Sequence, residues 1–130
     1  YFGCLKYINE NKDLKNNIKN ILSVSSGSIF ALFLIFNFTI DDCYKWLSSV
    51  EKLNINNISL KSVVSLNKKF GLDDSEGVKD FVKKIYDYAK VSHTITFREI
   101  SQVYGKNLII CTANVTKNEL FYFSVDTTPD

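Results

Sequence analysis

The chain has 130 residues, of which 45% are hydrophobic, with 16 basic and 14 acidic side chains and a formal net charge of +2. This length supplies one domain with a core and is too short for two ordinary domains, so we expect a single domain or a piece of one. The near balance of charge argues against nucleic acid as a partner.

The first predicted elements alternate between helix and strand. Residues 2–9 have apolar side chains at helical spacing and predict a helix, whereas 9–17 (NENKDLKNN) predicts a polar turn. The β-branched run at 18–24 predicts a buried strand. The apolar run at 29–38 has no polar face, which is typical of a helix in the centre of a domain, and it is well short of the roughly 20 residues that a membrane span needs.

Two capping boxes indicate where later helices begin. Thr39 with Asp42 opens one predicted helix, and Thr96 with Glu99 opens another that ends at Gly105. Both pairs have the three-residue spacing that lets each residue's side chain satisfy the other's backbone amide.

The remaining segments complete an alternating pattern. Residues 52–75 have mixed periodicity, and we expect a short helix there in a surface excursion. Residues 78–89 predict an amphipathic helix, and 107–115 and 120–125 predict two strands that TKNE joins as a hairpin. Alternating helices and apolar strands indicate an α/β fold in which helices cover a sheet.

The sequence SVSSG at 23–27 joins the first predicted strand to the central helix. It matches the G-x-S-x-G nucleophile elbow with serine in place of the first glycine, and it puts Ser25 at the apex. We interpret Ser25 as the candidate catalytic nucleophile, with Ser23, Ser26 and Gly27 as elbow support. Small residues are also favoured in such a crowded turn on steric grounds alone, so a purely structural interpretation stays open.

A serine nucleophile needs a base. His93 is the one histidine, and its polar segment has no evident tie to the elbow, so we assign it a surface role. Without histidine the base must be a carboxylate or a lysine. The cysteines Cys4, Cys43 and Cys111 lack CxxC or Cys/His spacing, which argues for reduced thiols and against a zinc site.

Three segments resemble patatin-like phospholipases. They are YFGCLKYINEN at the start, SVSSGSIFALFLIFNFTIDDCYKWL from Ser23, and ITFREISQVYGKNLIICTANVTKNELFYFSVDTTPD at 95–130. Among subfamilies the chain looks most similar to those of large DNA viruses. The resemblance implies a three-layer α/β/α patatin-like fold, incomplete at both ends, so that 1–130 is a single partial domain and an internal fragment.

The resemblance also implies a Ser–Asp dyad that hydrolyses acyl esters of membrane lipids, with Ser25 matching the nucleophile. The family's glycine-rich oxyanion loop should precede Tyr1, and its Asp-Gly-Gly or Asp-Gly-Ala aspartate should follow Asp130. No aspartate here is followed by glycine, so the dyad aspartate is not in this chain, and we expect the 130 residues alone to be inactive. We expect solvated or capping roles for Asp13, Asp41, Asp42, Asp73, Asp74, Asp80 and Asp87, and we assign no catalytic role to Asp126 or Asp130.

The resemblance implies a phospholipid or other acyl-ester lipid as substrate, without cofactor or metal. We expect a cytoplasmic protein with peripheral membrane contact, for which Trp46, Lys68, Lys69 and Phe70 are candidates. Two alternatives stay open. One is a non-catalytic lipid-binding or interaction pseudoenzyme of the same fold, favoured by serine at position 23. The other is a nucleotide-binding domain, against which no glycine-rich phosphate motif occurs.

Overall fold

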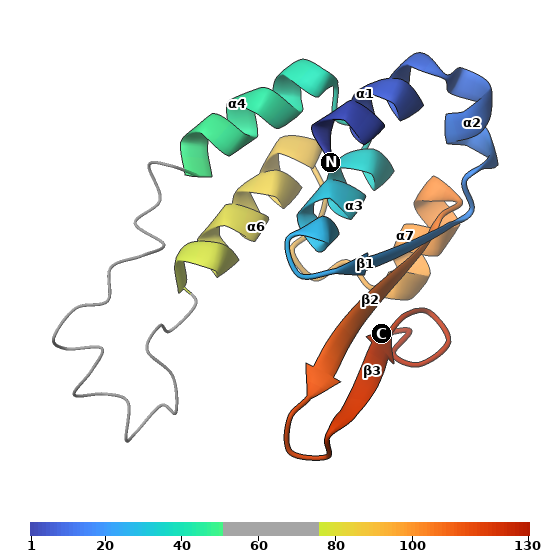
Figure 1. The fold of residues 1–130 in the computed structure, drawn as a ribbon, viewed down its shortest axis with the longest axis vertical. Helices are drawn as coiled ribbons and strands as arrows, with labels where there is room; N and C mark the ends of the chain where they lie inside the picture. Colours follow the sequence, from blue (N-terminus) through green and yellow to red (C-terminus); the bar gives the residue numbers. More distant parts are fainter. Residues whose placement is uncertain (51–75) are drawn as a thin grey trace, which may run out of the picture. The chain divides into compact units, whose positions relative to one another are not determined.

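The computed structural model describes residues 1–50 and 76–130, and the chain forms two compact units (Figure 1). Unit 1 consists of Tyr1–Cys43 and Thr94–Asp130, and unit 2 lies within Tyr44–His93. The short helix predicted within 52–75 lies outside the described residues, as do the membrane-contact candidates Lys68, Lys69 and Phe70.

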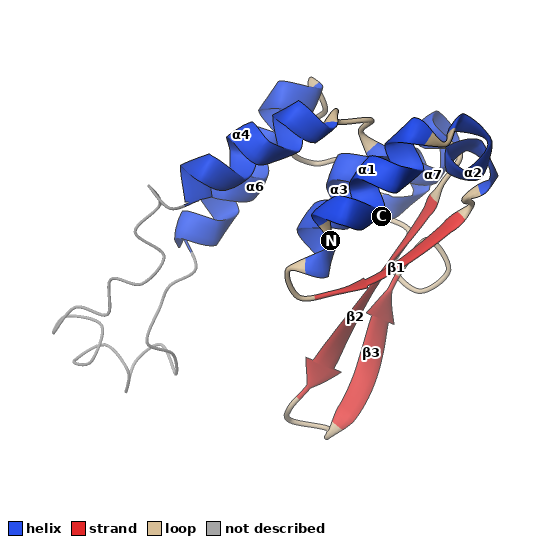
Figure 2. Ribbon diagram, turned by 45° about the horizontal axis from the view of Figure 1, so that its top comes forward, coloured by secondary structure: helices blue, strands red, loops and turns tan. Residues whose placement is uncertain are grey.

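Helices and a small sheet make up the described residues. The elements are α1 (Phe2–Glu10), α2 (Lys12–Asn17), β1 (Asn20–Val24), α3 (Gly27–Ile35), α4 (Ile40–Val50), α6 (Glu76–Ala89), α7 (Phe97–Tyr104), β2 (Asn107–Asn114) and β3 (Glu119–Phe123). In unit 1, β2 lies between β1 and β3, parallel to the first and antiparallel to the second (Figure 2). The predicted α/β class and the predicted hairpin are therefore confirmed.

Two predictions for the N-terminal region were wrong. The strand predicted to be buried forms as β1, but Leu22 and Val24 are exposed and only Ser23 is buried. The polar segment 9–17 does not form a turn alone, because it contains the six-residue helix α2. The Lys106 ammonium group donates to the carbonyl oxygens of Lys15 and Ile18, at 2.8 Å each, and so caps the C-terminal end of this helix. Lys106 is far from α2 in the sequence, and its hydrogen bonds add stability that local helix propensity does not supply.

The predicted central helix is confirmed as α3. Phe33 and Ile35 have no exposed surface, and the Phe33 ring stacks on Phe38 with centroids 5.0 Å apart. α3 packs against β1, and α7 packs against β2. The helix ends earlier than predicted, since Asn37 takes a left-handed φ of 59°. No helix in the described residues is long and apolar enough to cross a membrane.

Both predicted capping boxes form. The Asp42 amide donates to the Thr39 hydroxyl at 3.1 Å, and the Thr39 amide donates to the Asp42 carboxylate at 3.0 Å. Thr96 and Glu99 make the same reciprocal pair at the start of α7, which ends at Gly105 with φ 62°. These local signals therefore place two helix starts and one helix end correctly.

Unit 2 is held by aromatic contacts between α4 and α6. The Trp46 ring meets the rings of Phe81 and Tyr88 edge to face, with centroids 6.1 and 5.7 Å apart. Phe81 and Ile85 are buried, which confirms the amphipathic pattern predicted for 78–89.

Candidate active site

The backbone at Ser25 is strained. Ser25 is exposed and follows the last residue of β1. Its φ of 52° is a left-handed backbone conformation that residues other than glycine seldom adopt. The carbonyl oxygen of Ser25 accepts from the Ser28 amide at 3.0 Å, and that of Ser26 accepts from the Ile29 amide at 3.1 Å, which closes the first turn of α3. The chain therefore reverses sharply from strand to helix and presents the Ser25 hydroxyl to solvent.

Two backbone amides stand free beside this hydroxyl. Neither the Ser26 nor the Gly27 amide donates to an acceptor within the described residues. Free amides are expected in the first turn of a helix, where they carry partial positive charge. They are thus available to an anion that forms at Ser25.

Ser23, which replaces the usual glycine, is accommodated without strain at its own position. Its side chain is buried, and its hydroxyl lies 3.2 Å from the Ser28 Oγ and 3.3 Å from the carbonyl oxygen of Ile109. The added hydroxyl therefore ties β1 to α3 and to β2. Ser23 and Ser28 pack the turn, while Ser25 and Ser26 remain exposed.

Gly27 allows α1 to approach α3 closely. A Cβ at this position would lie 3.3 Å from the Tyr1 hydroxyl, and the Tyr1 ring is stacked on Phe30 at 4.7 Å between centroids. A larger residue would have to displace that ring. The predicted support residues thus surround the apex.

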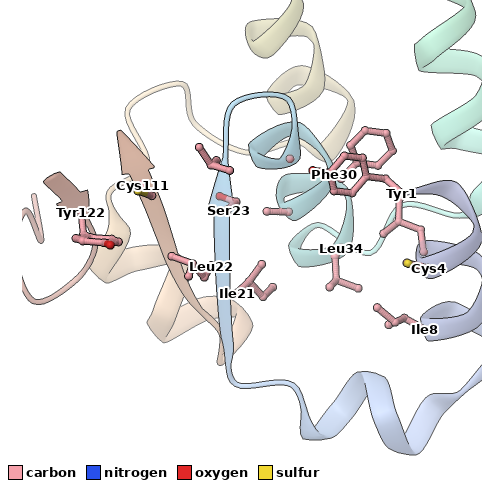
Figure 3. Close-up of a pocket in the computed structure, with 14 residues that line it drawn as sticks. Tyr1, Cys4, Ile8, Ile21, Leu22, Ser23, Phe30, Leu34, Cys111 and Tyr122 are labelled. Atoms are coloured by element: carbon pink, nitrogen blue, oxygen red, sulfur yellow. The ribbon is translucent and has the colours of Figure 1, made fainter. Parts of the chain in front are cut away.

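An apolar cavity of about 450 Å³ adjoins the turn (Figure 3). Val24 and Gly27, on either side of the apex, contribute to its lining. In Figure 3 Phe30 and Leu34 of α3 and Cys4 of α1 lie across from β1. The volume is within the range of about 300–1,000 Å³ usual for small-molecule sites.

Sequence reasoning missed the contribution of α1 to this cavity. Tyr1, Cys4, Leu5 and Ile8 all line it. Tyr1 lies three and four residues before Cys4 and Leu5, and Ile8 lies four and three residues after them, so all four share one face. That spacing is the signal that could have found them.

No base pairs with Ser25 among the described residues. His93 is in unit 2, where its Nε2 lies 2.7 Å from the Asp87 carboxylate. Asp42 caps α4, and Asp130 lies 3.3 Å from the Arg98 guanidinium. A capping role is thus seen for Asp42 and ion pairs for Asp80, Asp87 and Asp130, while Asp73 and Asp74 lie outside the described residues.

The described residues also hold no group of three or more His, Cys, Asp or Glu side chains that could bind a metal ion. Cys4, Cys43 and Cys111 are free thiols. Burial, and then the adjacent Asp42 carboxylate, raises the pKa of the Cys43 thiol to about 11. Cys43 is therefore protonated at neutral pH and unsuited to act as a nucleophile.

Comparison with known proteins identifies the family. A profile described as patatin-like phospholipase matches residues 1–130. The chain belongs to the patatin-like phospholipase family. This membership confirms the predicted resemblance and fits the α/β architecture.

Two curated relatives are viral, as the resemblance predicted. The chain is 32% identical over 127 residues to an uncharacterized protein of Acanthamoeba polyphaga mimivirus, covering 98% of this chain and 41% of that protein. It is 30% identical over 117 residues to a protein of Invertebrate iridescent virus 6 named as a probable lipid hydrolase, covering 88% and 40%. The chain thus spans about two fifths of the length of these relatives. Solved structures offer no significant match.

Proposed function

We propose that the protein is a serine lipid acyl hydrolase of the phospholipase A type, in which Ser25 attacks the ester carbonyl carbon. The observation that carries this proposal is the left-handed φ of 52° at Ser25, on a sharp strand-to-helix turn in a patatin-like chain. Strain of this kind concentrates at functional sites and is the mark of a nucleophile elbow. The name of the iridescent virus relative supports lipid hydrolysis in general.

The chemistry proceeds in two acyl transfers. As the Ser25 oxygen bonds to the carbonyl carbon, its proton passes to the base and the carbonyl oxygen becomes an oxyanion. The Ser26 amide, free of an intramolecular acceptor among the described residues, is placed to donate to that oxyanion. The alcohol then leaves with a proton from the base, and water cleaves the acyl-serine to free acid and regenerated Ser25.

The other parts of the machinery come from outside these 130 residues. We assign the base to an aspartate and the remaining oxyanion donors to a glycine-rich loop, so the 130 residues alone are inactive. Residues 1–130 then contribute the nucleophile portion of one patatin-like domain that meets its lipid substrate at a membrane surface.

The apolar cavity fits the acyl chain of the substrate. It adjoins Ser25 through Val24 and Gly27 and is lined along α3 and α1 by Phe30, Leu34 and Ile8. Burying an acyl chain there contributes about 0.8 kcal/mol per methylene. The cavity therefore favours long-chain over short-chain esters.

The accommodation of Ser23 argues against the pseudoenzyme alternative. That alternative was favoured by a hydroxyl where the elbow pattern has glycine. The Ser23 hydroxyl has acceptors at 3.2 and 3.3 Å, and the turn keeps its left-handed apex beside it. Serine at position 23 is therefore compatible with the left-handed apex that the proposal requires.

The test compares two neighbouring exposed serines in the full-length protein. Ser25→Ala should reduce hydrolysis of a p-nitrophenyl ester and of phospholipid by about 10³-fold or more, because the nucleophile is lost. Ser26→Ala, which keeps the backbone amide, is the matched control and should retain activity within a few fold. A fluorophosphonate probe should label Ser25, read by mass spectrometry. Equal activity in the wild type and Ser25→Ala would refute the proposal.

A further inference from the structure

A second cavity of about 280 Å³ lies at the amino end of β1, away from the Ser25 turn. Lys15, Lys19 and Lys106 all line it. Lys19 and Lys106 directly precede two paired parallel strands, and the Asn107 amide donates to the Lys19 carbonyl oxygen at 2.7 Å. Figures 1 and 2 both show α2, the start of β1 and α7 together in this region.

The cavity is cationic and contains no acid. None of its lining side chains is a carboxylate, and none of the three lysines forms an ion pair within the described residues. Asn16 and Tyr104 add polar groups to the wall. For a chain of net charge +2, three lysines without a partner acid form a marked local concentration of positive charge.

Lys106 is the lysine of this cavity that is buried and held by hydrogen bonds. Only 8% of the residue is exposed, and its ammonium group donates to the carbonyl oxygens of Lys15 and Ile18 at 2.8 Å each. An ammonium group has three hydrogens, so one donor remains after these two bonds. The side chain is held in place and keeps one donor for a ligand.

The electrostatics of the cavity favour an anion. Burial, followed by the charges of Lys19 and Lys15, lowers the pKa of Lys106, and burial lowers that of Lys15. The charged lysines are therefore disfavoured by desolvation and mutual repulsion, and a bound anion relieves both effects.

We infer that this cavity binds a phosphate-type anion, carried either by free phosphate or by a lipid head group. The Lys15 ammonium group donates to Asn9 Oδ1 at 2.8 Å and that of Lys19 donates to the Asn16 carbonyl oxygen at 3.2 Å. Each of the three lysines lining the cavity therefore keeps at least one donor for such an anion, and Lys106 anchors it. β1 has five residues and so separates this site from the Ser25 turn by about 17 Å. The inference stands on the lysine cluster and does not depend on the proposed hydrolase activity.

The test uses two double variants of the full-length protein that remove the same charge. Lys15→Gln with Lys19→Gln removes two positive charges from the cavity lining, and Lys12→Gln with Lys117→Gln removes two exposed lysines outside it. Calorimetric titration with inorganic phosphate should show binding that the first pair weakens by about tenfold or more, the loss expected for one charged hydrogen bond. The second pair should stay within about twofold of the wild type, as expected for exposed charges that make no contact with the ligand.

A second arm separates the two sources of the anion. Co-sedimentation is measured with phosphatidylcholine vesicles with and without phosphatidic acid. Binding to phosphate identifies a free anion, and binding only to phosphatidic acid vesicles with the same lysine dependence identifies a head group. Absence of both, or equal losses in the two double variants, would overturn the inference. If the cavity variant does not fold, a phosphate-dependent rise in the wild-type Tm that chloride does not produce supports the site, and its absence counts against it.

Discussion

The two ends of strand β1 carry opposite chemistry. At the carboxyl end, the chain turns through strained Ser25 beside an apolar cavity that α1 and α3 line. At the amino end, Lys19 and Lys106 line a polar cavity at the C-terminal ends of α2 and α7. Helix starts offer free amides to an anion, whereas helix ends offer carbonyl oxygens, which here accept from the ammonium groups of Lys19 and Lys106. A single parallel strand therefore separates a strained, exposed serine from a cluster of lysines.

The largest effect should come from removing the anchor at the amino end. Lys106→Met leaves the part-buried carbonyl oxygens of Lys15 and Ile18 without this donor, so we expect a loss of about 2–4 kcal/mol in the free energy of unfolding. Urea denaturation measures it. Lys117→Met, an exposed control, should change stability by no more than about 0.5 kcal/mol. Equal stability of the two variants would contradict a stabilising role for Lys106 at the amino end of β1.

Filling the cavity at the carboxyl end should change substrate selectivity. Ala31 is buried and lines the cavity, so Ala31→Phe reduces the space for an acyl chain. In the full-length protein we expect kcat/KM for long-chain esters to fall by about tenfold relative to short-chain esters. Ala31→Val is the smaller control and should give an intermediate ratio. An unchanged ratio would place the acyl chain elsewhere.

Thiol labelling of the wild-type protein should report whether a ligand occupies the apolar cavity. Cys4 is exposed and lines the apolar cavity, whereas Cys43 is buried with its pKa raised to about 11. A non-hydrolysable long-chain acyl ligand should slow iodoacetamide modification of Cys4, read on its peptide by mass spectrometry. Cys43 should stay unmodified with or without ligand. Modification of Cys4 at the same rate in both conditions would speak against occupation of the cavity.

The smallest effect is a pH dependence confined to the amino end. Because burial lowers the pKa of Lys106 in the folded state below its ordinary value of 10.5, the unfolded chain binds more protons between those two pKa values. The contribution of Lys106 to stability should therefore increase as pH rises towards 10.5. The difference in unfolding free energy between wild type and Lys106→Met, measured from pH 8 to 10.5, should grow. A constant or shrinking difference would contradict this sign.

Local patterns in the sequence predicted most of the elements. The pairs Thr39 with Asp42 and Thr96 with Glu99 bond within one helical turn, so each signal is complete in a few residues. The apex at Ser25 was placed by its motif, and the structure has a left-handed residue there. Its catalytic role stays a prediction.

Features made by distant residues were not predicted. Helix α2 is polar and short, and its cap comes from Lys106, 91 residues after Lys15. The lysine cluster likewise joins residues from α2, the start of β1 and the start of β2. No window of the sequence contains both halves of these contacts, so periodicity and capping patterns cannot detect them.

The pairing of β1 with β2 has a consequence for synthesis of the protein. Ser23 and the Ile109 carbonyl oxygen that its hydroxyl can reach are 86 residues apart, and all strand pairs of β1 within the described residues are with β2. At about 5–20 residues per second, the ribosome needs on the order of 4–17 s to supply that partner. During this interval β1 and the serine turn lack β2, the strand that pairs with β1 in the described residues. The contact of Ser23 with β2 is therefore established only late in synthesis.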